Sequence, residues 1–193
     1  MQEREASGTI RLTKEKVYMD YNAILKPYSE DKTINVVIEI PKGSSHKIEF
    51  DRTRKIMVLD RVEPAIFAKP VNYGFIPGTL DDDGDELDVL FVTDEPMTTG
   101  VVSEATVIGV LEFEDDGEMD HKVICVPADD RNTGNRIQSL DDLGEQWKKQ
   151  IDHHFSRYKD LKKPGSTKVL GFGDSAKAHE VIAECIERWN KEG

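Results

Sequence analysis

The feature that most restricts the fold is a series of short apolar runs between residues 35 and 127, each separated from the next by turn residues. Gly or Pro marks the turns, at Pro41-Lys42-Gly43, Pro77-Gly78, Asp83-Gly84 and Asp116-Gly117. Such runs are typical of β-strands, and strands are expected at residues 36–40, 47–50, 56–59, 87–92, 105–113 and 123–126. No helical pattern of ten residues intervenes before Ser139, which favours a meander or small barrel over β-α-β units.

Beyond Ser139 the spacing of apolar residues changes to that of a helix. Apolar or aromatic residues recur every three or four positions from 140 to 158, which predicts an amphipathic helix that begins at Ser139 and ends before Pro164-Gly165. A second helix is expected from about Asp174 or Ser175. The predicted class is therefore α+β and mainly β, a barrel or strongly curved sheet flanked by C-terminal helices. Residues 1–34 are expected to form an extension packed on a single domain that spans residues 1–193.

The charge balance narrows the possible partners. The chain carries 26 Lys and Arg against 38 Asp and Glu, a net charge of −12 at pH 7. Nucleic-acid binding depends on a basic surface, so this charge argues against a nucleic-acid partner. The apolar stretches are too short for a membrane span and residues 1–11 hold no apolar signal segment, which predicts a cytoplasmic protein without a membrane partner. Cys125 and Cys185 lie in apolar runs and are expected to be buried small hydrophobes.

Two acidic runs carry the excess negative charge. One contains Asp81, Asp82, Asp83, Asp85, Glu86 and Asp88, and the other Glu112, Glu114, Asp115, Asp116, Glu118 and Asp120. Clustered carboxylates repel one another unless hard cations neutralise them, and Mg²⁺ prefers carboxylate, water and phosphate oxygens. The runs therefore indicate either a magnesium site or exposed loops that bind nothing. The first run does not fit an EF-hand, because Thr79 stands where the leading Asp is required, and the lack of His and Cys disfavours zinc.

Basic and hydroxyl residues recur between these runs and could supply the phosphate-binding half of such a site: Lys47, Arg61, Tyr73, Lys122, Tyr158 and Lys159. Each has an ordinary interpretation when taken alone. Lysines at strand starts are commonly exposed, Arg61 beside Asp60 can form a surface ion pair of little energetic value, and Tyr158 continues the apolar stripe of its helix. Single residues of this kind do not establish a binding site.

Seven motifs stand in order along the chain: Glu39-Ile40-Pro41-Lys42-Gly43, Lys47-Ile48-Glu49, Asp60-Arg61, Asn72-Tyr73-Gly74-Phe75-Ile76-Pro77, Asp83-Gly84-Asp85-Glu86-Leu87-Asp88, Asp115-Asp116 with Asp120 and Lys122, and Tyr158-Lys159-Asp160-Leu161. Together they resemble the soluble family I inorganic pyrophosphatases. The resemblance implies an OB-like five-stranded β-barrel that forms a homo-oligomer, a hexamer or a dimer. It also implies hydrolysis of pyrophosphate, bound as a magnesium complex, to two orthophosphates with several Mg²⁺ per subunit. Mn²⁺ or Zn²⁺ are possible substitutes.

The resemblance further implies a role for each matching residue. Asp85 would be the general base for a water held between two metal ions, with Tyr73 and Arg61 also catalytic. The metal ligands would be Asp83, Asp88, Asp115, Asp120, Glu39 and Glu49, with Asp116 lining the site of a further ion. The phosphate-binding residues would be Lys47, Arg61, Tyr73, Lys122, Tyr158 and Lys159. Phosphoryl transfer to water would be direct and in line, without a covalent intermediate.

Two features of the chain are not explained by this pattern. Lys69 stands where many family members have a tyrosine, and it is expected either to contact phosphate or to point to solvent. His153, His154 and Arg157 are expected either at a subunit interface or on a solvated helix face.

Three other functions fit the sequence less well than this resemblance. A divalent-cation-binding barrel without catalysis would explain the acid but not the interspersed basic residues. An oligonucleotide-binding barrel is opposed by the negative charge and by the lack of a basic, aromatic groove. A Walker-type nucleotide site is excluded, because residues 163–168 lack the required Gly-Lys-Ser/Thr spacing.

Overall fold

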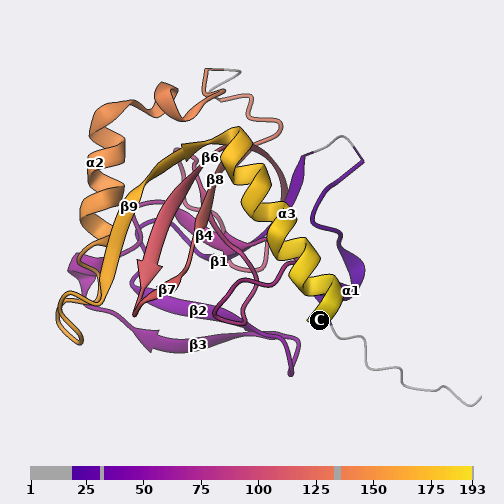
Figure 1. Cartoon of the computed structure of the whole chain (residues 1–193), viewed down its shortest axis with the longest axis horizontal. Helices are drawn as coiled ribbons and strands as arrows, with labels where there is room; N and C mark the ends of the chain where they lie inside the picture. Colours follow the sequence, from indigo (N-terminus) through magenta and orange to yellow (C-terminus); the bar gives the residue numbers. More distant parts are fainter. Residues whose placement is uncertain (1–18, 31–32, 133–135, 193) are drawn as a thin grey trace, which may run out of the picture.

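The structure is a computed structural model that describes residues 19–30, 33–132 and 136–192. Its centre is a closed ring of five strands (Figure 1). The order around the ring is β1 (Ile34–Ile40), β4 (Asn72–Phe75), β5 (Asp88–Phe91), β8 (Lys122–Pro127) and β6 (Val102–Asp115), and β6 pairs back with β1. Only the β5–β8 pair in this ring is parallel. The predicted mainly-β barrel is confirmed.

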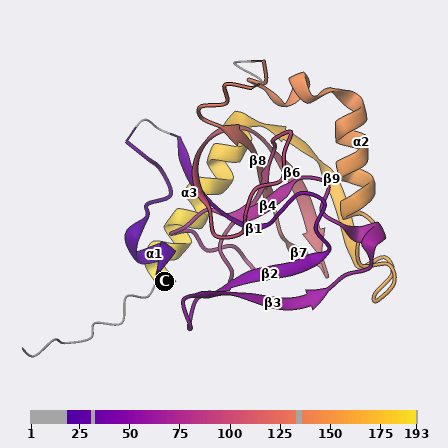
Figure 2. The same ribbon diagram turned by 180° about the vertical axis from the view of Figure 1, so that it is seen from behind.

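Smaller elements extend the barrel on two sides. Strands β2 (His46–Asp51) and β3 (Ile56–Val62) form a separate hairpin across one end of the barrel (Figures 1 and 2). Strand β9 (Thr167–Asp174) pairs with β6 outside the ring, and the short β7 (Glu118–Met119) pairs with the end of β6. Helix α1 (Tyr21–Ile24) is a single turn, and 3-10 turns occupy Ala65–Phe67 and Leu140–Leu143.

Two longer helices cover the barrel. Helix α3 (Ser175–Glu192) lies over one face and α2 (Gly144–Phe155) stands at the side next to β9, as the two opposite views show. Val181, Ile182 and Cys185 of α3 join the core cluster that includes β1 and β5, whereas Ile151 and Phe155 of α2 join a second cluster with β6. Cys125 and Cys185 are buried and unpaired, as expected. None of the helices in the described ranges is long and apolar enough to cross a membrane.

The helix predicted from Ser139 to Pro164 is shorter than expected. A 3-10 turn at Leu140–Leu143 precedes it, Gly144 has a φ of 78°, and α2 ends at Phe155. Tyr158 follows in a turn yet still packs on the same cluster, which explains why the apolar spacing continued past the helix end. Strands β4, β7 and β9 were not predicted, while the second helix begins at Ser175 as expected.

The N-terminal extension is only partly described, because residues 1–18 and 31–32 lie outside the described ranges. Tyr21 is buried, and its ring packs edge-on against Phe50 and Phe75 with centroid separations of 5.1 and 6.2 Å. This contact fixes α1 against the β2–β3 hairpin and β4.

Gly74 lies at a close approach of β1 and β4. It pairs with Ile38, and a Cβ atom at this position would overlap the carbonyl oxygen of Val37. Gly74→Ala is therefore expected to lower the free energy of unfolding by at least about 1–3 kcal/mol, since the two strands must separate to admit the methyl group. Urea denaturation of the variant checks this, and an unchanged midpoint would contradict the strand packing described.

Candidate active site

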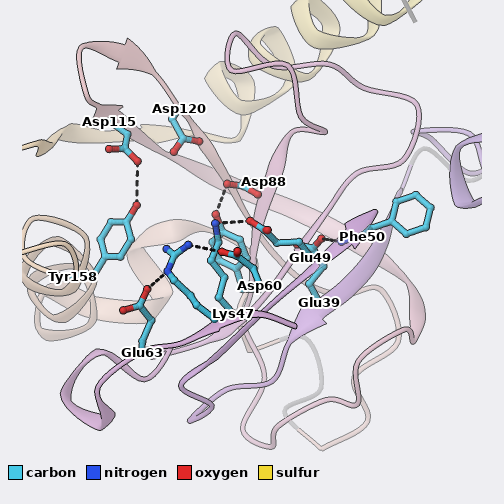
Figure 3. A network of polar contacts seen from close by, with 12 residues as sticks. Glu39, Lys47, Glu49, Phe50, Asp60, Glu63, Asp88, Asp115, Asp120 and Tyr158 are labelled. Atoms are coloured by element: carbon cyan, nitrogen blue, oxygen red, sulfur yellow. Dashed lines mark hydrogen bonds and ion pairs between the residues drawn. The ribbon is translucent and has the colours of Figure 1, made fainter. Parts of the chain in front are cut away.

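A pocket of about 700 Å³ opens between the β2–β3 hairpin and the adjacent end of the barrel. Almost all the site residues predicted from the sequence line it: Glu39, Lys47, Glu49, Arg61, Tyr73, Asp83, Asp85, Asp88, Asp115, Asp116, Asp120, Tyr158 and Lys159. The exception is Lys122, which is buried behind two of the aspartates. Figure 3 shows Asp88, Asp115 and Asp120 facing Lys47 and Asp60 across the pocket. The fold thus gathers residues from distant motifs into one cavity.

The acidic wall of the pocket is built by the parallel pairing of β5 with β8. Asp88 begins β5 and lies opposite Lys122, the first residue of β8, so that Asp120 falls beside Asp88. The turn before β5 carries Asp83 and Asp85, and the end of β6 carries Asp115. Two acidic runs that are separate in the sequence therefore form one surface.

Lys122 neutralises part of this wall from behind. Its Nζ lies 2.6 Å from Oδ2 of Asp88 and 2.7 Å from Oδ1 of Asp120, and its side chain is only 2% exposed. Burial alone would lower the pKa of Lys122, but the two carboxylates outweigh burial and raise it above its usual value. Lys122 is thus a fixed internal cation, and direct phosphate binding by it stays a prediction.

The basic wall is the β2–β3 hairpin. Lys47 pairs with Arg61 across the hairpin, and the next pair is Ile48 with Leu59, so Asp60 is an extra residue on β3. Such a bulge re-aims the neighbouring side chains. Lys47 forms an ion pair with Glu49, and Arg61 forms ion pairs with Asp60 and Glu63 (Figure 3). Asp60 and Glu63, which hold Arg61, were not predicted as site residues although they flank it in the sequence.

Hydroxyl donors complete the pocket between the two walls. The Tyr73 hydroxyl donates to Asp88, and the Tyr158 hydroxyl donates to Oδ2 of Asp115 at 3.2 Å. Lys159 forms an ion pair with the same Asp115, and Lys163 lies 2.6 Å from Asp116. Burial, together with nearby carboxylates, raises the pKa of both tyrosines, so they stay protonated donors.

Two carboxylates have pKa values raised by their surroundings. Asp85 lies exposed at the pocket surface, where partial desolvation and the charge of Asp83 raise its pKa to about 6. A carboxylate with such a pKa can accept a proton near neutral pH. Glu39 is buried and accepts a hydrogen bond from the Phe50 N–H at 2.7 Å, and burial followed by the charge of Asp88 raises its pKa. One carboxylate oxygen of Glu39, Oε1, therefore holds the backbone of the β2–β3 hairpin at Phe50.

Two arginines that the sequence analysis missed hold the acidic turn. Arg188 of α3 donates to the carbonyl oxygen of Leu80 at 2.6 Å and pairs with Asp82 at 2.6 Å. Arg52, from the β2–β3 turn, donates to Glu86 at 2.9 Å and to the carbonyl of Gly84 at 3.2 Å. Neither arginine lies near the turn in sequence, so only the tertiary fold identifies them.

The residues present fit hard cations by their chemistry. All the candidate ligands are carboxylates, and Oδ1 of Asp115 is buried without a hydrogen-bond partner, which leaves a free oxygen for an ion. In residues 19–30, 33–132 and 136–192 no group of three or more His, Cys, Asp or Glu is close enough to form a ready-made metal site. Lysines instead contact Asp88, Asp115 and Asp120. An ion can therefore bind the unpartnered Oδ1 of Asp115 while Lys159 keeps its contact with Oδ2.

Comparison with known proteins agrees with this geometry. The family model described as "Inorganic pyrophosphatase" matches residues 36–190. A protein named inorganic pyrophosphatase from Neisseria meningitidis serogroup B is 63% identical over 174 residues, 90% of this chain and 98% of that protein. Among solved structures, an inorganic pyrophosphatase from Neisseria gonorrhoeae is 62% identical with a TM-score of 0.87, covering 89% of this chain and 99% of that one.

A more distant relative supports the same assignment. The inorganic pyrophosphatase of Thermus thermophilus is 38% identical with a TM-score of 0.80 and covers 90% of this chain and 99% of that one. The family model spans residues 36–190, which include the β2–β3 hairpin, α2 and nearly all of the barrel and α3. This chain therefore belongs to the family I inorganic pyrophosphatases, enzymes of the hydrolase class.

Proposed function

We propose that this protein hydrolyses inorganic pyrophosphate to two orthophosphates and takes its substrate as a magnesium complex. The observation that carries the proposal is the division of one pocket into a carboxylate wall and a wall of Lys, Arg and Tyr. Pyrophosphate is an anion, so the carboxylates admit it only together with cations, while the basic wall can bind phosphate oxygens directly. A cation-binding barrel without catalysis would not require the basic wall.

We further propose that several Mg²⁺ ions bind each subunit. Asp83, Asp88, Asp115 and Asp120 are the proposed direct ligands, Glu39 and Glu49 hold a substrate-borne ion in part through water, and Asp116 lines the site of a further ion. When bound, the ions neutralise the phosphates and lower the pKa of the attacking water. Mn²⁺ or Zn²⁺ are proposed as possible substitutes.

The remaining steps belong to protein groups. Asp85 accepts a proton from the attacking water, in keeping with its raised pKa of about 6. Arg61, Lys47 and Lys159 bind phosphate oxygens and neutralise the charge that develops on the leaving phosphate. Tyr73 and Tyr158 donate hydrogen bonds without adding charge. Lys122 steadies Asp88 and Asp120 from behind.

Three wider features are part of the proposal. Residues 1–193 form one domain, and the protein acts in the cytoplasm without nucleic-acid or membrane partners. It assembles as a homo-oligomer, either a hexamer or a dimer.

Two residues of α2 and the turn after it could contact another subunit. His153 and Arg157 are exposed there. His154 instead packs against Phe155 and Tyr158, and burial lowers its pKa to about 3.

Orthophosphate release from pyrophosphate tests the proposal directly. Purified protein is expected to release orthophosphate rapidly with Mg²⁺ and to lose this activity with a chelator, because the acidic wall repels metal-free substrate. Activity is measured by phosphate colorimetry, and folding of the chelated protein is checked by circular dichroism. A folded protein that releases no phosphate with Mg²⁺, Mn²⁺ or Zn²⁺ would leave the cation-binding barrel as the better description.

A further inference from the structure

Backbone hydrogen bonds on both sides of Lys69 hold this residue in place at the pocket. It lies between the 3-10 turn Ala65–Phe67 and β4, and its N–H donates to the carbonyl of Ser44 at 2.9 Å. Its carbonyl in turn accepts from the N–H of Gly43 at 2.8 Å. The half-buried side chain lines the pocket rather than pointing to solvent. The residue therefore has a defined position beside the proposed substrate.

Aromatic rings surround the Lys69 ammonium. Its Nζ lies 4.2 Å from the centre of the Tyr73 ring, 5.2 Å from that of Tyr158 and 5.3 Å from that of Phe155. Ring faces attract a cation but do not neutralise its charge. Two of the three rings carry the hydroxyl groups proposed to bind phosphate, so the ammonium lies where the phosphate is expected.

Within the part of the chain that the structure describes, Lys69 forms no ion pair with a carboxylate, unlike the other proposed phosphate-binding cations. Lys47, Arg61 and Lys159 each form an ion pair with a carboxylate. Among the described residues, no ion pair or hydrogen bond of the Lys69 ammonium is found. Burial and the charge of Lys122 lower the pKa of Lys69 to about 8. At neutral pH the Lys69 ammonium is therefore still charged in most molecules. An anion entering the pocket would supply the missing partner.

We propose that Lys69 is an additional substrate-binding residue, whose ammonium group contacts a phosphate oxygen of bound pyrophosphate while the rings of Tyr73, Tyr158 and Phe155 hold it in place. This inference rests on the proposed function. It assigns to the pocket one cation that need not break an ion pair before it binds phosphate, in contrast to Lys47, Arg61 and Lys159.

The test compares charge-removing and charge-keeping variants. Binding of imidodiphosphate, an analogue whose P–N–P bridge resists hydrolysis, is measured by calorimetry with Mg²⁺ for the wild type, Lys69→Met and Lys69→Arg. Lys69→Met keeps the packing on the rings and is expected to weaken binding about tenfold or more, the usual loss for a hydrogen bond to a charged group. Lys69→Arg is expected to stay within about threefold of the wild type. Lys168→Met, which removes an exposed lysine on β9, controls for net charge and is expected to bind normally.

The outcomes separate this inference from the proposed function. Michaelis constants for magnesium pyrophosphate should follow the calorimetric order, with kcat changed less than the Michaelis constant. If the wild type binds and hydrolyses normally but Lys69→Met binds as tightly, the Lys69 contact is wrong and the proposed function stands. If Lys69→Met and Lys69→Arg lose affinity equally and both melt earlier, Lys69 has only a packing role. A wild type that neither binds the analogue nor hydrolyses pyrophosphate would overturn the proposed function itself.

Discussion

Asp85→Asn is expected to lower kcat for pyrophosphate hydrolysis by about 100- to 10,000-fold, the usual contribution of a general base. The amide cannot accept the proton that the attacking water loses, yet it has nearly the same size as the carboxylate. The backbone bonds of residue 85 would persist, since its N–H donates to Asp83 and its carbonyl accepts from Asp81. Steady-state rates at saturating substrate and Mg²⁺ measure the change.

Glu118→Gln provides the matched control for this substitution. Glu118 is an exposed carboxylate on β7, beyond the pocket wall but within the second acidic run. Glu118→Gln removes one negative charge, as Asp85→Asn does, and is expected to leave kcat within about twofold of the wild type. Circular dichroism and thermal melting verify that both variants fold. If Asp85→Asn retained more than a tenth of the wild-type kcat, the assignment of Asp85 as the base would be wrong.

Lys122→Met is expected to lower the free energy of unfolding of the metal-free protein by about 3–5 kcal/mol, the cost of leaving buried charge without its partner. Lys122 lies between Asp88 and Asp120, whose side chains are 22% and 13% exposed, so water cannot replace it fully. Urea denaturation in the presence of a chelator measures the loss. Added Mg²⁺ should restore part of it, because an ion can take the place of the ammonium between the two carboxylates.

A second lysine makes a close comparison possible. Lys148 also contacts two carboxylates, Asp141 at 2.8 Å and Glu145 at 3.2 Å, but these are 90% and 79% exposed. Lys148→Met is expected to cost less than about 1 kcal/mol, since surface ion pairs contribute little. Equal losses for the two variants would show that Lys122 is not an internal counter-charge.

The barrel was predictable because most of its strands are distinct apolar runs, but β4, β9 and the two-residue β7 were not predicted. Strand β4 has only four residues and includes Gly74, a residue that is uncommon in strands and is tolerated here because β1 lies so close. Strand β9 follows Pro164-Gly165 and contains two glycines, so its sequence resembles a loop. It becomes a strand because the exposed edge of β6 offers unpaired backbone groups.

The candidate site was predictable as a set of residues but not as an arrangement. The motifs identified the carboxylates, Lys47, Arg61 and the tyrosines, and the structure brings them to one pocket. The burial of Lys122 and the aromatic surroundings of Lys69 could not be predicted, because both depend on how β4, β8 and the turn after α2 meet in space. Lysines are ordinarily exposed, and sequence spacing carries no sign of the exceptions.

The contact of Arg188 with the acidic turn has a consequence for the order in which the protein can mature. Arg188 binds the carbonyl of Leu80 across 108 positions of chain, and the Leu80 N–H donates to the carbonyl of Cys185 at 3.0 Å. During synthesis, which runs from the N-terminus, the turn that carries Asp83 and Asp85 emerges long before α3 can meet it. A nascent chain therefore completes its active pocket only after α3 has left the ribosome.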